Sequence, residues 1–349
     1  MKLYKQILFS ILIIFFKTET VFSENNLFNV NNIKLEKKDK TANSALADQA
    51  FKKGFDQLTK KILLKEDIYK ISNLSISTIK QLVTYYQISN IPEKENEEEL
   101  VNFSITFDKE KIHDLFYKKG ISYSEILDKE IYVLPVFING NEVLVFNNNF
   151  FYKNWNKVNK NKLIEFILPL ENIEIIQNIN TYKNNLINVN ISNLFEGYPN
   201  KNLAFVLIED NKADNSKVYI KARIQEKNIS KSLVIQKQKK QKNTHYENII
   251  FETNNELIDL IKSRNLIDIR TPSFLNAKFN INKKNNLVEL NSRIKNIDAI
   301  ENIFVQEFNK DFMHIRIKYL GKLDKIITLL KRKNIDLQLI NDQWIIKTL

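Results

Sequence analysis

The sequence predicts an α+β fold made of several small α/β modules, and three observations support this prediction. Segments with apolar residues at helical spacing are interspersed with short segments in which apolar and polar residues alternate, as in half-buried strands. The chain divides into three blocks, and each block contains both kinds of segment. The last block reads strand, helix, strand, strand, helix, strand, which is the order of a ferredoxin-like βαββαβ sandwich.

Residues 1–23 have the three parts of a secretory signal peptide. Lys2 and Lys5 precede a largely apolar run over 7–16, and the small residue Ser23 follows a short polar stretch. The run is shorter than the roughly 20 apolar residues that cross a bilayer. We therefore expect cleavage between Ser23 and Glu24, and export of the rest of the chain.

The first block, 24–128, is expected to form an N-terminal α+β domain. Its predicted elements are a strand over 27–35, helices over 47–62 and 76–83, strands over 85–91 and 100–107, and a helix between Asp108 and Gly120. Asp108 is a typical N-cap residue, and Gly120 is a typical C-cap. Gly54 lies on the apolar face of the first helix, where glycine lowers helix propensity. We therefore expect another part of the chain to come close at Gly54.

The second block, 129–268, is expected to form a central mixed α/β domain. Asn139-Gly140-Asn141 separates two apolar runs, which is a strong signal for a β-hairpin. Pro135 lies inside the first run and predicts that this strand is at a sheet edge or is bulged. The expected elements are strands over 131–138, 143–146, 163–168, 203–208, 217–225, 231–238 and 246–252, a helix over 150–155, and a helix that begins at a capping box of Thr253 and Glu256.

The third block, 269–349, is expected to form the ferredoxin-like domain. Its predicted elements are strands over 274–281, 300–308, 312–320 and 337–347, and helices over 287–297 and 323–330. A four-stranded antiparallel sheet with two helices on one face would bury all of these apolar faces at once.

The composition excludes several kinds of chemistry. The chain has no cysteine, so it has no thiol nucleophile, no thiolate metal site and no disulfide. The net charge is +12, which is typical of proteins that bind nucleic acid or an anionic surface. Arginine is rare beside abundant lysine, asparagine and isoleucine, a bias typical of AT-rich coding sequence, and export removes nucleic acid from reach. We therefore expect no nucleic-acid partner.

The residues that usually carry catalysis or metal binding form no recognisable constellation. The three histidines lie far apart, and the five glycines form no phosphate-binding loop. Glu110 and His113 have the spacing of one half of a di-iron motif, without the further carboxylates that such a site needs. We expect no cofactor, no metal and no enzymatic activity.

Two clusters remain as candidate binding sites. The aromatic residues Phe146, Phe151 and Trp155 lie close together in the sequence, where they would line either a ligand groove or a seam in the core. The basic residues of the second cluster would either contact an anionic membrane or wall surface, or lie in a solvated loop. They are Lys237, Lys239, Lys240 and Lys242.

The mature chain resembles an exported proteobacterial family known only as a domain of unknown function. The pieces that carry the resemblance are Phe28 and Val30 in the opening strand, the alanine-rich start of the first helix over 42–55, the strand and helix from 101 to 123, the run Val133-Leu-Pro-Val-Phe137, the segment 148–150, and Trp155. The resemblance implies an envelope protein of a Gram-negative bacterium, with a likeness to the amino-terminal domain of TolB or to flagellar domains of the FlgT type. It implies no catalytic residues.

These observations leave three functional hypotheses. The first is a periplasmic, non-enzymatic protein that works through contact with unidentified envelope proteins. The alternative is a periplasmic ligand-binding protein or hydrolase with a site at the aromatic cluster of the central domain. The third is a secreted protein of an AT-rich eukaryotic parasite, which four glycosylation sequons would permit. The sequons begin at Asn73, Asn102, Asn190 and Asn228.

Overall fold

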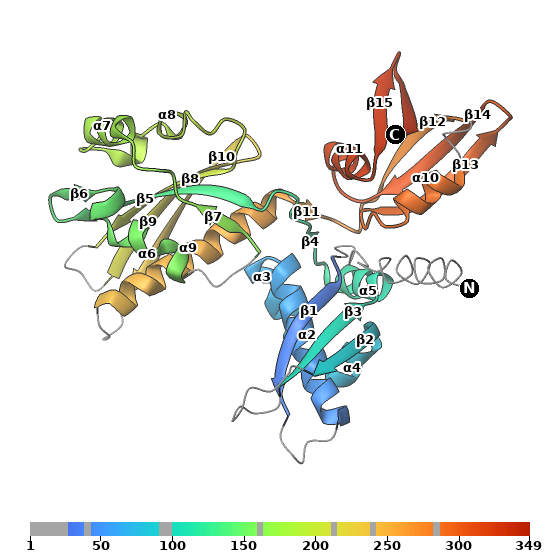
Figure 1. The fold of residues 1–349 in the computed structure, drawn as a ribbon, viewed down its shortest axis with the longest axis horizontal. Helices are drawn as coiled ribbons and strands as arrows, with labels where there is room; N and C mark the ends of the chain where they lie inside the picture. The colour runs from blue at the N-terminus through green and yellow to red at the C-terminus, as the bar shows by residue number, and fades with distance from the viewer. Residues whose placement is uncertain are drawn as a thin grey trace, which may run out of the picture. The chain divides into compact units, whose positions relative to one another are not determined.

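The computed structural model describes residues 27–37, 43–90, 100–158, 163–210, 215–237, 242–281 and 287–349. The predicted signal peptide and the expected cut between Ser23 and Glu24 lie outside the described residues. The fold is α+β, with helices interspersed among several separate sheets, as the sequence predicts (Figure 1). The chain forms two compact units. One combines the described parts of 1–59, 70–122 and 267–349, and the other combines 60–69 with the described parts of 123–266.

The N-terminal module of the first unit is a three-stranded antiparallel sheet in the order β1-β3-β2. Its elements are β1 (Asn29–Glu36), α2 (Asn43–Ile62), α4 (Ile76–Gln81), β2 (Val83–Asn90), β3 (Leu100–Phe107) and α5 (Lys109–Lys119). The last residues of α2, the short α3 (Lys65–Ile68) and the first residue of the 3₁₀ turn η1 (Tyr69–Ile71) belong to the second unit. Because β3 alternates buried and half-buried residues, one face of the sheet packs under α2.

Both predicted caps of α5 and the expected close approach at Gly54 are present. The Asp108 carboxylate accepts hydrogen bonds from two backbone N–H groups of the first turn, at 3.0 and 3.1 Å, and Gly120 ends the helix with φ 63°. A Cβ atom at Gly54 would lie 2.9 Å from Cδ1 of Ile33 and of Ile105. Side chains of the sheet therefore fill the space that a larger residue would take.

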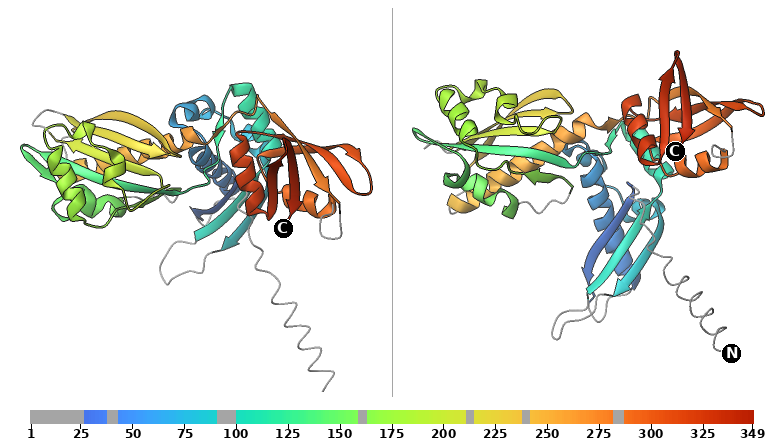
Figure 2. Two further views of the ribbon diagram at one scale, coloured as in Figure 1. Left: turned by 90° about the horizontal axis from the view of Figure 1, so that it is seen from above. Right: turned by 45° about the horizontal axis from the view of Figure 1, so that its top comes forward.

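The second unit, which we call the central unit, is built on a six-stranded mixed sheet in the order β10-β9-β8-β5-β6, with β7 also paired to β5. Its strands are β5 (Glu130–Asn139), β6 (Glu142–Leu144), β7 (Glu165–Ile167), β8 (Leu203–Glu209), β9 (Asn215–Ile224) and β10 (Lys227–Gln236). Its helices are α6 (Phe150–Val158), α7 (Ile173–Thr181), α8 (Ile191–Leu194) and α9 (Lys242–Arg264). Two 3₁₀ turns, η2 (Phe146–Asn148) and η3 (Leu186–Asn188), lie between them. Helices α6 and α9 cover one face of the sheet, and α7 and α8 cover the other (Figures 1 and 2). Each face buries its own hydrophobic core, so β8 is buried almost along its whole length.

Pro135 lies in an interior strand with one locally open side. On one side it is in parallel register with Val206 of β8. On the other side β7 and β6 pair only with the two ends of β5, at 130–132 and 137–139. The side-chain amide of Asn149 fills this gap and donates to the Pro135 carbonyl at 2.8 Å. The predicted edge is thus local, and a side chain replaces the missing strand.

The segment 246–252 is helical, so the prediction of a strand there is wrong. It lies inside α9, a single helix of 23 residues. Thr253, expected to cap a new helix, lies within α9 and donates to the Ile249 carbonyl one turn earlier, at 2.7 Å. Tyr246, Ile249 and Ile250 are all buried against the sheet. The apolar residues thus follow helical spacing, and a short β-branched run obscured this pattern in the sequence.

The C-terminal module of the first unit has the predicted helices, but its sheet has five strands. Its elements are β12 (Ser273–Asn280), α10 (Leu287–Ile294), β13 (Ile300–Phe308), β14 (Phe312–Tyr319), α11 (Leu323–Arg332), β15 (Ile335–Ile340) and β16 (Gln343–Thr348). The sheet order is β13-β14-β12-β16-β15, and a short two-stranded sheet joins β4 (Tyr123–Ser124) to β11 (Leu266–Ile267) elsewhere in the chain. Both helices pack on one face of the five-stranded sheet.

The last predicted strand, 337–347, is a hairpin. Asn341 and Asp342 both have positive φ, 49° and 59°, and form the two-residue turn between β15 and β16. β16 pairs with β12 in parallel and separates it from β15. The purely antiparallel four-stranded sheet expected here is therefore wrong, because the Asn-Asp pair reverses the chain and adds a strand.

Candidate functional site

β10 is a sheet edge of unusual regularity among the described strands. Its ten residues pair with β9 without a register shift, from Lys227 opposite Ile224 to Gln236 opposite Asn215. Of the other described edge strands, β1, β2 and β13 contain register shifts, and β4, β6, β7, β11 and β15 are shorter. Bulges and short lengths protect sheet edges from pairing with other chains. β10 lacks both of these protections.

The turn that precedes β10 determines which of its backbone groups face outward. Gln225 and Glu226 form a two-residue turn with φ 48° and 63°, so the residues flanking them close the hairpin. In such a hairpin the flanking residues exchange main-chain hydrogen bonds, and alternate residues after them direct N–H and C=O away from the partner strand. The outward groups of β10 are thus those of Asn228, Ser230, Ser232, Val234 and Gln236.

A hollow of about 400 Å³ lies beside the end of β10, between this strand and α9. Its walls are the end of β10 and one polar face of α9, with Lys65 at the rim. The lining residues are Lys65, Leu233, Val234, Ile235, Gln236, Lys237, Asn248, Glu252, Asn255, Glu256 and Asp259. An edge strand next to a helix-walled hollow is the arrangement in which proteins bind an extended peptide by strand addition.

The acidic side chains of the hollow are paired with lysines through long contacts. Lys231 lies 3.4 Å from Glu256, and Lys65 lies 3.7 Å from Glu252. Such exposed pairs contribute little, so an incoming polar side chain can replace them at small cost. Burial raises the pKa of Asp259 above its usual value, although nearby lysines oppose the shift. The hollow thus offers exchangeable polar contacts beside the backbone of β10.

A buried polar network lies at the carboxyl end of β8, and sequence reasoning missed it. Ser216 Oγ lies 2.8 Å from His245 Nε2 and 3.1 Å from Asp210 Oδ1. Tyr246 donates to the other Asp210 oxygen at 2.8 Å, and Lys237 forms an ion pair with Asp210 at 2.7 Å. These residues come from the ends of β8 and β10, from β9 and from α9, which are separate in the sequence, so no spacing signal could have revealed the cluster.

The proton arrangement in this network does not suit a serine nucleophile. Burial alone would raise the pKa of Asp210, but hydrogen bonds from Lys237, Tyr246 and Ser216 outweigh it and hold the pKa below its usual value. The ionised carboxylate only accepts, so the Ser216 hydroxyl donates to it and accepts from His245 Nε2–H. His245 is then not a base toward Ser216, unlike the histidine of a catalytic triad. Ser216 is also fully buried.

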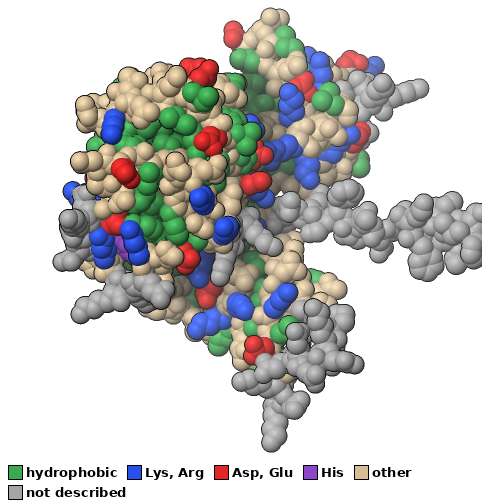
Figure 3. All heavy atoms as spheres, turned by 60° about the vertical axis from the view of Figure 1, so that its left-hand side comes forward, with side chains coloured by type: hydrophobic (Ala, Val, Ile, Leu, Met, Phe, Trp, Pro, Cys, Tyr) green, Lys and Arg blue, Asp and Glu red, His purple; other side chains and the backbone are tan. Residues whose placement is uncertain are grey.

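The network also alters the interpretation of the predicted basic cluster. Lys237 is held by Asp210, and the Lys242 ammonium lies 5.4 Å from the centroid of the Tyr246 ring. Lys239 and Lys240 lie outside the described residues. Figure 3 shows Lys and Arg side chains scattered among hydrophobic patches on the visible face of the central unit. The two lysines of the cluster that the structure describes, Lys237 and Lys242, therefore have partners within the chain. Both contacts lie next to the start of α9.

The predicted aromatic cluster is core. Phe151 and Trp155, both on α6, are fully buried in the core between the sheet and helices α6 and α9, whereas Phe146 is buried in the other core, across the sheet. The three residues thus do not share one groove, and none of them lines the hollow beside β10. Asn149 fixes this junction, because its side chain accepts from Phe151 N–H at 2.9 Å and donates to the β5 carbonyl already described. The alternative expectation, a seam in the core, describes this region.

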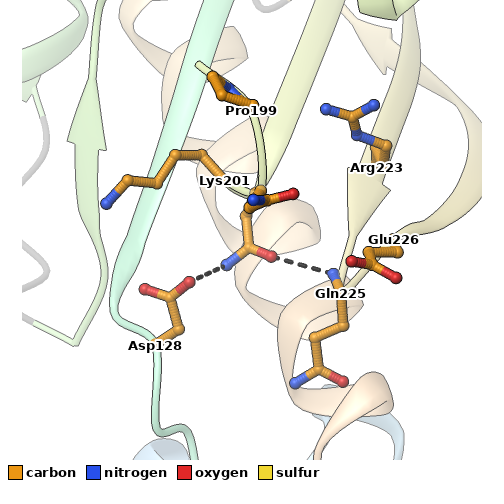
Figure 4. Close-up of a pocket in the computed structure, with 8 residues that line it drawn as sticks. Asp128, Pro199, Lys201, Arg223, Gln225 and Glu226 are labelled. Carbon is orange, nitrogen blue, oxygen red and sulfur yellow. Dashed lines mark hydrogen bonds between the residues drawn. The ribbon is translucent and has the colours of Figure 1, made fainter.

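A second hollow, of about 550 Å³, lies at the amino ends of β5 and β8 (Figure 4). Asn202 lines this hollow and links two of its other residues. The Asn202 side chain donates a hydrogen bond to Asp128 at 3.0 Å and accepts one from Gln225 N–H at 3.1 Å. Lys201 points away from Arg223 and forms an ion pair with Glu130 at 2.9 Å. The polar groups here are largely used in holding three chain segments together. Ligands of mixed sheets usually bind at the opposite, carboxyl ends of parallel strands.

The described residues contain no group of three or more His, Asp or Glu side chains that could hold a metal ion. They also contain no helix long and apolar enough to cross a membrane.

No family model and no curated protein matches this chain. The chain is similar to a solved structure described as "Crystal structure of uncharacterized protein", at 8% sequence identity, over 40% of this chain and 94% of that one. The TM-score is 0.16, and at that value the likeness carries no argument about fold or function.

Proposed function

We propose that this protein is exported to the periplasm of a Gram-negative bacterium and acts there, without catalysis, by binding an extended segment of another envelope protein. The segment would add as a strand to the edge of β10. The observation that carries this proposal is the regular, ten-residue edge of β10 beside the hollow walled by α9.

The backbone of β10 would supply most of the affinity. A strand laid along Asn228 to Val234 would meet N–H and C=O groups that have no strand on their outer side among the described residues. Val234 has 63% of its surface exposed and would gain an apolar neighbour. Side chains of the added strand on the α9 side would meet Glu252 and Glu256, which favours a basic side chain at that position.

Export is supported by the features of residues 1–23 and by the resemblance to an exported proteobacterial family of unknown function. The absence of cysteine means that the protein folds on its hydrophobic cores alone, as the large cores on both faces of the central sheet allow. Cell fractionation tests this part: recovery in the periplasmic fraction supports it, and recovery in the cytoplasm contradicts it.

Affinity purification after in vivo crosslinking tests the contact itself. Ser232→Pro removes an outward N–H of β10 while sparing the ladder with β9, so it should abolish capture of the partner. Ser232→Ala keeps the backbone donor and should capture the partner like the wild type. Equal capture by both variants would contradict strand addition, and capture of this chain alone would contradict a distinct partner.

A ligand-binding protein is the second candidate, with the hollow of Figure 4 as its site and two features of its lining as support. Gln225 and Glu226 line it in a left-handed backbone, where residues other than glycine, asparagine and aspartate are strained, and strain gathers at functional sites. Arg223 offers guanidinium N–H groups beyond its 3.2 Å hydrogen bond to Ser192. Small carboxylates are the probe: thermal stabilisation by acetate or succinate that Arg223→Gln removes would support this candidate, and no shift would reject it.

A further inference from the structure

In the described part of the C-terminal module, one face of the sheet carries no helix. In β12 and β14, alternate residues are buried under α10 and α11, so their neighbours point to the opposite side. We call this side the open face, and include the residues of β13 that are in register with it. Its residues are Phe274, Asn276, Lys278, Asn302, Phe304, Glu307, Phe312, His314, Arg316 and Lys318.

Two cations of the open face lie on phenyl rings. The Arg316 guanidinium carbon lies 4.2 Å from the ring centroid of Phe274, and the Lys278 ammonium lies 4.3 Å from that of Phe312. Stacking against a ring fixes the guanidinium plane and leaves its N–H edge free to bind an oxyanion. The face therefore presents two oriented cations on neighbouring strands.

The charge of the open face is positive and only partly balanced. Lys318 is paired with Glu301 at 2.8 Å, and His314 lies 3.3 Å from Glu307. Neither Lys278 nor Arg316 forms an ion pair with a carboxylate among the described residues. An anionic partner would thus meet two cations that need no prior exchange of partners.

Exposed phenyl rings accompany these cations. On the open face, Phe274 and Phe304 are exposed at 47% and 44% of their surfaces, and Phe304 lies in the β13–β14 hairpin. The hairpin extends past α10 and α11 (Figures 1 and 2). Exposed apolar groups next to unpaired cations are typical of surfaces that bind the headgroup region of a bilayer, where rings enter the apolar layer and cations meet phosphate.

We propose that the open face docks on an anionic lipid surface, with Arg316 and Lys278 on the phosphate groups and Phe274 and Phe304 entering the interface. A flat acidic protein segment would satisfy the cations but would leave the rings without an apolar environment, so lipid accounts for more of the face. The inference does not depend on strand addition at β10, which belongs to the other unit.

Vesicle co-sedimentation tests this docking. It uses the protein purified from its native cells, after any cleavage of the N-terminal segment that those cells carry out. The vesicles are phosphatidylcholine alone, or phosphatidylcholine with phosphatidylglycerol. The double variant Lys278→Gln/Arg316→Gln should bind the anionic vesicles about 30-fold more weakly than the wild type, because each cation near the surface contributes about fivefold. The matched control, Lys331→Gln/Arg332→Gln on α11, should lose much less, and Phe304→Ser should weaken binding without changing the charge.

Four outcomes decide the matter. Binding to anionic vesicles that falls with salt and is lost only in the open-face variants supports the proposal. No binding by the wild type, or equal loss in the α11 control, overturns it. Binding to poly-glutamate that depends on Arg316, without binding to vesicles, assigns the face to an acidic protein and also overturns it. Thermal unfolding of each variant shows that it is folded.

Discussion

The buried ammonium of Lys262 donates a hydrogen bond to the backbone carbonyl of Leu63, with a distance of 2.7 Å. A second bond of the same length reaches the carbonyl of Lys60, and Asp259 lies 3.7 Å away. These carbonyls lie at and just beyond the end of α2, where backbone acceptors lack helical partners. Burial lowers the pKa of Lys262, although Asp259 opposes the shift. One lysine of α9 thus caps the end of another helix.

Lys262→Met should lower the free energy of unfolding by about 2–3 kcal/mol, because it leaves two carbonyls without their donor and Asp259 without its cation. Urea unfolding measures this loss. The control is Lys227→Met at the exposed start of β10, which should change stability by no more than about 0.5 kcal/mol. Equal effects of the two substitutions would contradict a capping role.

Gly54→Ala should destabilise the protein despite the higher helix propensity of alanine. The new methyl group would lie 2.9 Å from Ile33 and Ile105, and overpacking of this kind costs about 1–3 kcal/mol against a helix gain of about 1 kcal/mol. Gly197→Ala is the control, because a Cβ there meets nothing within 4 Å. A stabilised Gly54→Ala variant in urea unfolding would show that the sheet does not pack as described.

Asp210 should support stability in neutral solution and cease to do so in acid. Its pKa in the folded protein lies below the ordinary value of 3.8, so its contribution is present above that pH and is lost as the pH falls further. The difference in unfolding free energy between the wild type and Asp210→Asn should therefore be large at pH 7 and shrink below about pH 4. A difference that is independent of pH would contradict an ionised Asp210 in the network.

His113 should make the protein less stable in mild acid. Burial is the main cause that lowers the pKa of His113 from 6.5 to about 4. The nearby positive charge of Lys109 adds to this shift, and the negative charge of Glu301 opposes it. Stability is then full above pH 6.5 and falls as the pH drops toward 4, by about 2–3 kcal/mol, because only the unfolded chain binds the proton readily. His113→Phe, which keeps the ring near Phe28, should weaken this dependence. NMR titration of the histidine checks the pKa directly.

The local patterns of the sequence were sufficient to predict most elements of the fold. Asp108 and Gly120 bracket α5, and the alternation from Val101 to Phe107 marks β3, because caps and side-chain alternation act within a few residues. The errors are of two kinds. The run Ile249-Ile250-Phe251 resembles a strand but belongs to the long helix α9, and the turn at Asn341 and Asp342 lacks the glycine that usually marks a hairpin.

The candidate site was beyond sequence reasoning for a different reason. The edge of β10 is a property of sheet order, which long-range pairing decides, and each residue of β10 taken alone is ordinary. Likewise Asp210, Ser216 and His245 meet only because β8, β9 and α9 converge. The sequence shows that Lys237 belongs to a basic cluster, but it could not show that Lys237 forms an ion pair with Asp210.

A photo-crosslinking residue placed on β10 in living cells tests the central claim most directly. It is introduced at Val234, and at Val288 of α10 as a control with 80% of its surface exposed. Strand addition predicts a discrete adduct with an envelope protein from position 234, which Ser232→Pro abolishes, and no such adduct from position 288. Identical adducts from both positions, an adduct only with a second copy of this chain, or no adduct at position 234 would contradict the account.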